Sequence, residues 1–268
     1  MATGFQIIEI ARDTYRILDA DEDSFYLVVG DERAALIDTG VTPGVQIRPM
    51  LAEITDKPIV LVLTHAHVDH FHHMDEFDTV YMSHEEFHMP TDMLREMMMG
   101  KTLDLAGTID IHTDDIIDLG GEQLEICRVP GHTPGTVVVL AKQRNILFTG
   151  DAIGSGYGVW MQVPGALPLE DYYESLRQLM RWLVLRGGRM TFHGGHDLQQ
   201  YQSTLVRNYN PLGMGLLADL IDLVDGILRG EIVGHLSNEA QSFGMEPAYY
   251  ASFGRAEIQY LRSRIRRG

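Results

Sequence analysis

Four potential metal ligands follow a short apolar stretch near residue 60, and this segment restricts the fold more than any other part of the sequence. The stretch Ile59–Leu63 is typical of a buried strand. Directly after it, within six residues, come His65, His67, Asp69 and His70. A loop that leaves a strand end can direct alternate imidazoles at one ion while the next two side chains turn towards a neighbouring position. Because imidazole nitrogen and carboxylate oxygen both suit zinc, the segment predicts a loop with ligands for two metal ions.

Three further candidates lie where other apolar stretches end: His132, Asp151 and His196, each preceded by a glycine. Ligands that are distant in sequence must converge within about 2 Å of an ion, so strand ends with glycine-containing turns are natural positions for them. We therefore expect strands to end at or just before His65 and each of these three residues, and their side chains to meet.

The ordered motifs HxHxDH, GH, GD and GH resemble those of the metallo-β-lactamase superfamily, in the branch that contains glyoxalase II and the N-acyl homoserine lactonases. The segment Ile37-Asp38-Thr39-Gly40 also resembles an early strand-to-loop segment of that family, and the matching part extends from Ala35 to His196. One short motif is weak evidence, whereas four in the right order are strong. The resemblance implies an α/β fold, a four-layer αββα metallo-β-lactamase sandwich with the metal site at one edge.

The resemblance also implies a role for each ligand. The first metal ion would be held by His65, His67 and His132, the second by Asp69, His70 and His196, and Asp151 would bridge the two. The ions would be two zinc ions, with iron or manganese as alternatives. A metal-bridging hydroxide would be the nucleophile, because coordination lowers the pKa of water from about 15.7 to roughly 7, and Asp69 would act as a catalytic residue that orients it. The implied function is hydrolysis of a small ester-like substrate, a lactone or a thioester.

Three segments have no clear counterpart in that resemblance. Many relatives follow HxHxDH with small residues, whereas this chain has Phe71-His72-His73, which either packs elsewhere or lines the pocket. The Met-rich segment 89–100 is interpreted as a helix, either packed on the sandwich or serving as a substrate lid. In the lactonases a tyrosine soon after the bridging aspartate assists the substrate, and Tyr157 is our candidate for that catalytic role.

Other functions remain open. A small-molecule phosphodiesterase would use the same ligands, and an iron-dependent oxidative enzyme resembling the sulfur dioxygenases would too, because His and Asp bind iron as readily as zinc. A non-catalytic binding module is the third class, and retention of every ligand argues against it. Metal analysis followed by a substrate screen discriminates among these hypotheses.

The order of apolar stretches predicts two sheets covered by helices. Strands are expected at 5–10, 14–18, 25–29, 34–37, 59–63, 79–82, 124–129, 136–140, 145–148 and 189–192. Helices are expected from about residue 42 to 54, at 169–185, at 216–228 and from Pro247 onward. We assign residues 1–197 to a metallo-β-lactamase-like catalytic domain and 198–268 to a helical C-terminal extension packed on it.

The composition restricts partners and location. Cys127 is the only cysteine, so an intramolecular disulfide and a thiolate-rich zinc or iron–sulfur site are excluded. The formal net charge of −17 repels polyanions, and no apolar run reaches the length of a membrane span. We therefore expect a small-molecule substrate, no nucleic-acid or membrane partner, and a cytoplasmic location, since the N-terminus lacks a secretory pattern. A homodimer is left open.

Overall fold

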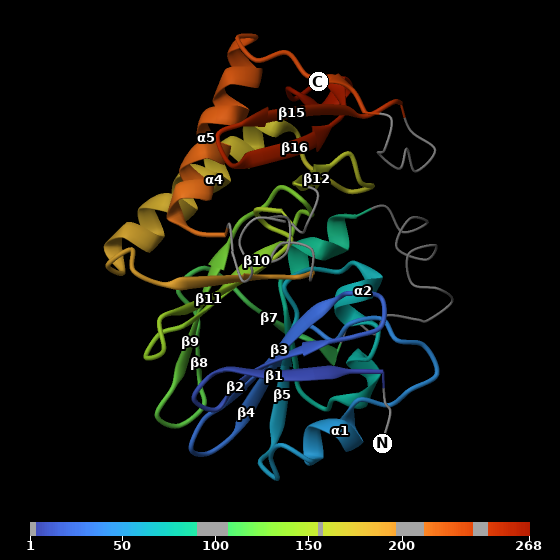
Figure 1. The fold of residues 1–268 in the computed structure, drawn as a ribbon, viewed down its shortest axis with the longest axis vertical. Coiled ribbons are helices and arrows are strands. Elements are labelled where there is room, and N and C mark those ends of the chain that lie inside the picture. Colours follow the sequence, from blue (N-terminus) through green and yellow to red (C-terminus); the bar gives the residue numbers. More distant parts are fainter. Residues whose placement is uncertain (1–3, 90–106, 155–157, 197–211, 238–245) are drawn as a thin grey trace.

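The computed structural model describes residues 4–89, 107–154, 158–196, 212–237 and 246–268, which form three sheets with helices around them (Figure 1). The first sheet has seven strands that follow one another in chain order. They are β1 (Gln6–Ala11), β2 (Thr14–Leu18), β3 (Ser24–Val29), β4 (Ala34–Ile37), β5 (Ile59–Val62), β6 (Val80–Met82) and β7 (Ile109–Asp110). β1 to β4 pair in antiparallel fashion and β4 to β7 in parallel, so the sheet is mixed.

The second sheet has five strands and is also mixed. In spatial order they are β13 (Thr191–Gly194), β11 (Ile146–Gly150), β10 (Val137–Ala141), β9 (Gln123–Arg128) and β8 (Ile116–Asp118). Only the β13–β11 pair is parallel. All ten strands expected from the sequence are present, and the short strands β7 and β8 had not been expected.

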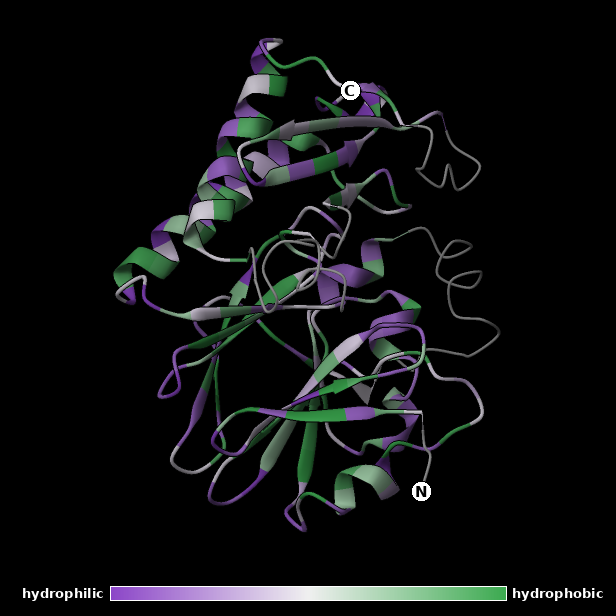
Figure 2. Ribbon diagram, in the orientation of Figure 1, coloured by the Kyte–Doolittle hydropathy of each residue, from purple (hydrophilic) through white to green (hydrophobic). Residues whose placement is uncertain are grey.

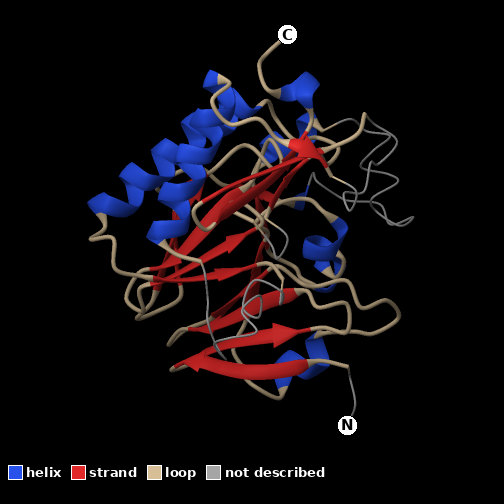
Figure 3. Ribbon diagram, turned by 45° about the horizontal axis from the view of Figure 1, so that its top comes forward, coloured by secondary structure: helices blue, strands red, loops and turns tan. Residues whose placement is uncertain are grey.

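The two sheets pack face to face over a shared apolar layer. Side chains of the first sheet in this layer include Val28, Ile37 and Val62, and those of the second include Ile126, Val139 and Phe148. Helices cover the outer faces: α1 (Arg48–Ala52) and α2 (Val68–Phe71) on the first sheet, and α4 (Leu169–Leu185) on the second, with α5 (Met214–Arg229) packed on α4. Figure 3 shows this arrangement of outer helices, and the predicted αββα sandwich is confirmed.

Helix α4 has the bounds that the sequence predicted, because its apolar residues recur at helical spacing. Leu169, Tyr172, Leu176, Leu179 and Leu183 are all buried on one face. Figure 2 shows hydrophobic and hydrophilic residues alternating along α4 and α5, as in amphipathic helices. α5 ends as expected at Gly230, whose φ of 73° is readily adopted by glycine.

Helix α1 is shorter than expected. It begins at Arg48, because the side chain of Glu76 accepts hydrogen bonds from the backbone N–H groups of Ile47 and Arg48. These are among the N–H groups that a helix start leaves without partners inside the helix. Glu76 belongs to the short 3-10 helix η1 (Met74–Glu76), so the helix start depends on a residue far along the chain.

The C-terminal extension is not wholly helical, and the helix predicted from Pro247 is wrong. This part forms the strands β15 (Tyr249–Phe253) and β16 (Ala256–Tyr260), joined by a tight turn at Gly254, where φ is 58°. β16 pairs with β15 and with β12 (Val159–Met161), and this pairing decides for a strand over the helical spacing of Ile258, Leu261 and Ile265.

A third sheet therefore joins the extension to the sandwich. It runs β12, β16, β15 and β14 (His235–Leu236), and β12 and β16 pair in parallel. The short 3-10 helices η2 (His84–His88) and η5 (Arg262–Arg264) complete the elements. The boundary at residue 198 stays a prediction, because residues 197–211 lie outside the described part. None of the described helices is long and apolar enough to cross a membrane.

Candidate metal centre

The structure brings all seven predicted ligands to one edge of the sandwich. His65 and His67 follow β5, and Asp69 and His70 lie in α2 directly after them. The other three follow strands of the second sheet: His132 after β9, Asp151 after β11 and His196 after β13. Asp151 directly follows its strand, whereas a loop of three residues separates β9 from His132. Their roles as ligands stay predictions, which the geometry below supports.

Three histidines form the first cluster. The Nδ1 atom of His67 lies 3.0 Å from Nε2 of His65 and 2.9 Å from Nε2 of His132. All three side chains are buried. Burial, together with the neighbouring histidines, lowers the pKa of His65, and burial lowers that of His67 to about 3 and also lowers that of His132. The rings are therefore neutral at physiological pH, as metal coordination requires.

Hydrogen bonds on the far side of the rings fix which nitrogens carry lone pairs. Nδ1 of His132 donates to the carbonyl oxygen of Trp160 at 2.8 Å, so its Nε2 is an acceptor. The hydroxyl of Thr64 donates to Asp38 and hence accepts from Nδ1 of His65, which leaves Nε2 of His65 as an acceptor too.

A cation fits this first cluster better than hydrogen bonds do. His67 contributes at most one proton on Nδ1, which can satisfy only one of the two acceptor nitrogens beside it. The remaining lone pairs converge without a donor. A zinc ion accepts three imidazole nitrogens in this way, so the donor set fits the metal.

Asp69, His70 and His196 form the second cluster. Oδ2 of Asp69 lies 3.5 Å from Nε2 of His70 and 3.4 Å from Nε2 of His196. Nε2 of His70 is buried and makes no hydrogen bond with the described residues. Mixed nitrogen and carboxylate donors again suit zinc, and the orphaned nitrogen is the expected sign of a ligand position.

Asp151 lies between the two clusters. Its Oδ2 atom is 3.6 Å from Nε2 of His132 in the first and 3.4 Å from Nε2 of His196 in the second. Although burial raises the pKa of Asp151, the nearby His196 and His70 lower it well below its usual value. Burial lowers the pKa of His196, but Asp151, Asp23 and Asp69 together raise it above its usual value. Asp151 is therefore an anion within reach of both clusters.

Carboxylates contact the histidine rings of the second cluster at Nδ1, the ring nitrogen opposite the one that faces the cluster. Nδ1 of His70 lies 2.8 Å from Oδ2 of Asp38, and Nδ1 of His196 lies 2.7 Å from Oδ1 of Asp23. Such contacts fix the tautomer and the orientation of a metal-binding histidine. Asp38 adopts a φ of 61°, an uncommon conformation for a non-glycine residue, and also accepts from the backbone N–H of Thr64. The sequence had marked Asp38 only as part of a family-like segment and gave no signal for Asp23.

Gly150 and Gly195 each directly precede a candidate ligand, and glycine is required at the two positions for different reasons. Gly150 has a φ of 46°, so it supplies the sharp bend that the sequence led us to expect. Gly195 is needed for space instead, because a Cβ atom there would lie 2.6 Å from Oδ1 of Asp151 and 2.7 Å from Cε1 of His70. The close approach of backbone to ligands thus excludes a side chain.

Several other candidates lie away from the ligands or outside the described part. Tyr157 and the Met-rich segment 90–100 are outside it, so their roles stay predictions. Phe71 is buried in the apolar layer beneath α1, and His73 contacts Glu76 through Nδ1 at 3.0 Å. His193 packs on Tyr26, and burial lowers its pKa to about 4.

The aromatic residues of the extension contact their own sheet. Tyr249 lies against the ring of Tyr260 and beneath the guanidinium of Arg262. Tyr250 contacts His235 of the neighbouring strand. These contacts help to hold the third sheet together.

The family model described as the metallo-beta-lactamase superfamily matches residues 19–201. Human acyl-coenzyme A thioesterase MBLAC2 is 28% identical over 196 residues, which are 61% of this chain and 69% of that protein. The metallo-beta-lactamase fold-containing protein ST1585 from Sulfurisphaera tokodaii is 28% identical over 194 residues, 63% of this chain and 72% of that protein.

Solved structures share the fold. A metallo-beta-lactamase from Pontibacter korlensis superposes with a TM-score of 0.58 at 20% identity and covers 81% of this chain and 97% of that chain. A beta-lactamase domain protein from Burkholderia ambifaria gives a TM-score of 0.59 at 17% identity, with coverage of 85% and 76%. At such low identity the likeness concerns the fold alone.

Proposed function

Because the chain belongs to the metallo-β-lactamase superfamily of metal-dependent hydrolases, we propose that it hydrolyses a small acyl thioester at a two-zinc centre. The observation that carries the proposal is the position of Asp151, whose Oδ2 atom is 3.6 Å and 3.4 Å from ligand nitrogens of the two clusters. One carboxylate within reach of both ligand sets is what a pair of metal ions requires.

The other six candidate ligands would form two sets, one on each side of the Asp151 carboxylate. One zinc ion would be held by His65, His67 and His132, the other by Asp69, His70 and His196, and both by Asp151. When bound, zinc lowers the pKa of a coordinated water to roughly 7 and polarises a carbonyl oxygen. Asp38 and Asp23 keep His70 and His196 oriented, and the carbonyl oxygen of Trp160 does the same for His132.

The single thiol is not a candidate nucleophile. Cys127 is fully buried in β9, and burial raises its pKa to about 12. A thiol that stays protonated and inaccessible cannot attack an acyl group. This supports chemistry at the metal centre instead.

The choice of a thioester rests on the similarity to an acyl-coenzyme A thioesterase. A lactone needs the same chemistry at the carbonyl carbon and is the nearest alternative substrate. The formal charge of −17 favours a small molecule over a polynucleotide, and a homodimer remains part of the proposal. Light scattering on the purified chain tests the dimer separately.

The decisive experiment combines metal analysis with a substrate screen. Protein purified without added metal is analysed for zinc, iron and manganese, and then assayed with acyl thioesters, lactones, β-lactams and phosphodiesters, with Asp151→Ala as the inactive control. We expect two zinc equivalents and turnover of thioesters. A single iron with oxygen consumption on persulfides would overturn the proposal, and so would two zinc ions with turnover of lactones or phosphodiesters only.

A further inference from the structure

Glu86 is a buried acid beside the metal centre that has no place among the predicted ligands. It lies in η2, after β6, and the residue is 1% exposed. Burying a carboxyl group costs free energy unless hydrogen bonds compensate for the lost water. The hydrogen-bond partners of Glu86 therefore indicate its role in the structure.

The hydrogen-bond donors to Glu86 lie in the loop that carries His132, a member of the three-histidine cluster. Its Oε1 atom accepts from the hydroxyl of Thr133 and, at 2.9 Å, from the backbone N–H of Gly135. Thr133 directly follows His132, so both donors belong to the loop that carries this histidine.

The side chain is closely enclosed at this junction. A Cβ atom on Gly135 would lie 2.7 Å from both Cγ and Oε1 of Glu86, so the glycine is needed for the carboxyl group to reach its donors. Thr133 is held in turn by Thr136, whose hydroxyl lies 2.7 Å from the Thr133 hydroxyl. The loop with His132 thus presents a fixed pair of donors to Glu86.

We infer that Glu86 is a positioning residue, which fixes the loop after β9 so that His132 converges with His65 and His67 on one metal ion. This inference rests on the proposed metal centre. Without the carboxyl group, the Thr133 hydroxyl and the backbone N–H of Gly135 would lose their buried acceptor, and the loop that carries His132 would be held less firmly. The zinc affinity of the three-histidine cluster should then fall, since positioning contacts of this kind typically contribute 10- to 100-fold to metal affinity.

The test is competition for zinc between the zinc-loaded full chain and a chromophoric chelator, with the cobalt-substituted absorption spectrum as a second readout. Glu86→Ala should weaken zinc binding at the three-histidine cluster by about tenfold or more and alter the cobalt spectrum. Glu86→Gln keeps an acceptor oxygen and should retain affinity within about threefold. If Glu86→Ala fails to fold, Thr133→Val removes one donor only and should weaken zinc binding severalfold.

The matched control is Glu122→Gln. Glu122 is also a buried acid, 2% exposed, but it pairs with Arg144 and the backbone of Gln143 away from the ligand loops. This variant should lower the melting temperature and leave zinc affinity unchanged. Glu86→Ala, or Thr133→Val in its place, with wild-type zinc affinity and an unchanged cobalt spectrum would overturn the inference. A wild-type chain that binds no zinc would instead overturn the proposed function.

Discussion

Oδ1 of Asp23 lies 2.7 Å from Nδ1 of His196, across the junction between the two sheets. Asp23 precedes β3 of the first sheet, and His196 follows β13 of the second. The backbone reinforces this contact, because the N–H of Ser24 donates to the carbonyl oxygen of Gly195 at 2.6 Å. His196, a candidate ligand of the second cluster, is therefore oriented by the opposite sheet.

Replacing Asp23 by Ala should selectively weaken the second metal site. His196 would lose the acceptor that holds its Nδ1 proton, so we expect zinc affinity at that site to fall by 10- to 100-fold while the three-histidine site is unaffected. Chelator competition on the zinc-loaded chain resolves the two sites. Asp21→Ala is the matched control in the same turn, since the side chain of Asp21 is exposed. Equal loss of both ions would contradict the prediction.

Asp69→Ala should remove the second ion and most activity without unfolding the chain. The Asp69 side chain is 27% exposed and contacts Nε2 of His70 and of His196, so the sheets do not depend on it. We expect zinc content to fall from two equivalents towards one, with turnover reduced at least about 100-fold and a melting temperature within a few degrees of wild type. Full zinc content with retained turnover would count against the two-metal proposal.

The sequence predicted the sandwich and the ligand set because both depend on local patterns. Short apolar stretches bounded by turn residues identified the ten strands, and the candidate metal ligands follow strands at their ends. The hairpin of β15 and β16 was missed because Ile258, Leu261 and Ile265 also have helical spacing. The strand was decided by pairing with β12, nearly 100 positions earlier, which no local pattern reveals.

The residues that orient the candidate ligands could not be predicted from the sequence for the same reason. Glu86 meets its donors 47 and 49 positions further along the chain, and Asp23 meets His196 only when the two sheets pack. Neither acid lies in a recognisable motif. A metal ligand can be predicted when it belongs to a local sequence motif. A residue that orients a ligand can be identified only from the tertiary contact between them.

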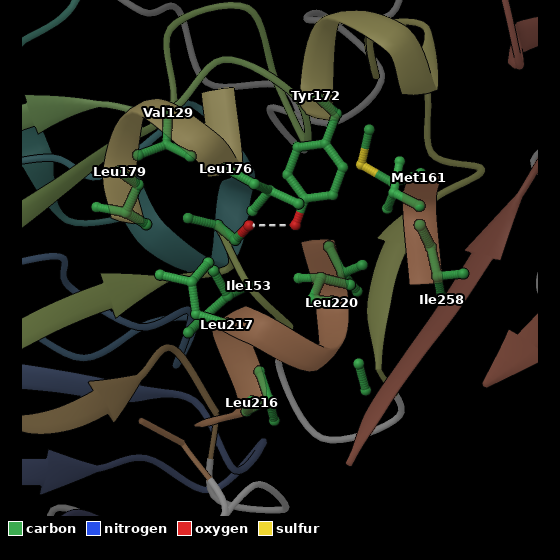
Figure 4. Close-up of a cluster of buried hydrophobic side chains, with 14 of the residues drawn as sticks. Val129, Ile153, Met161, Tyr172, Leu176, Leu179, Leu216, Leu217, Leu220 and Ile258 are labelled. Carbon is green, nitrogen blue, oxygen red and sulfur yellow. Dashed lines mark hydrogen bonds between the residues drawn. The ribbon is translucent and has the colours of Figure 1, made fainter. Parts of the chain in front are cut away.

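Tyr172→Phe should lower stability with little effect on metal binding. The Tyr172 hydroxyl donates to the carbonyl oxygen of Ala152 at 2.6 Å, next to Asp151, and the side chain is fully buried (Figure 4). Loss of this bond leaves a carbonyl oxygen without its donor, at a cost of about 1–2 kcal/mol in the free energy of unfolding. Urea denaturation measures the change. The neighbouring Tyr173→Phe is the control, because Tyr173 is partly exposed, and an equal effect of both variants would contradict the argument.

The last prediction concerns pH and Glu86. Burial raises the pKa of this carboxyl group from 4.5 to about 7, although hydrogen bonds from Thr133 and Gly135 and the charge of Arg128 lower it. The folded chain then binds the proton more tightly than the unfolded chain. Stability is therefore fully present below about pH 4.5 and is lost as the pH rises through about 7.

Wild type should accordingly lose about 3 kcal/mol of stability relative to Glu86→Gln between those limits, at about 1.4 kcal/mol for each pKa unit. The amide of the variant cannot titrate, while every other group is shared, so the difference between the two proteins isolates Glu86. Urea denaturation of both in metal-free form, from about pH 5 to about pH 8, measures it and avoids the pH dependence of zinc release. Parallel curves for the two proteins would show that Glu86 is ionised throughout, because an acid that stays charged in the fold contributes no slope over this range.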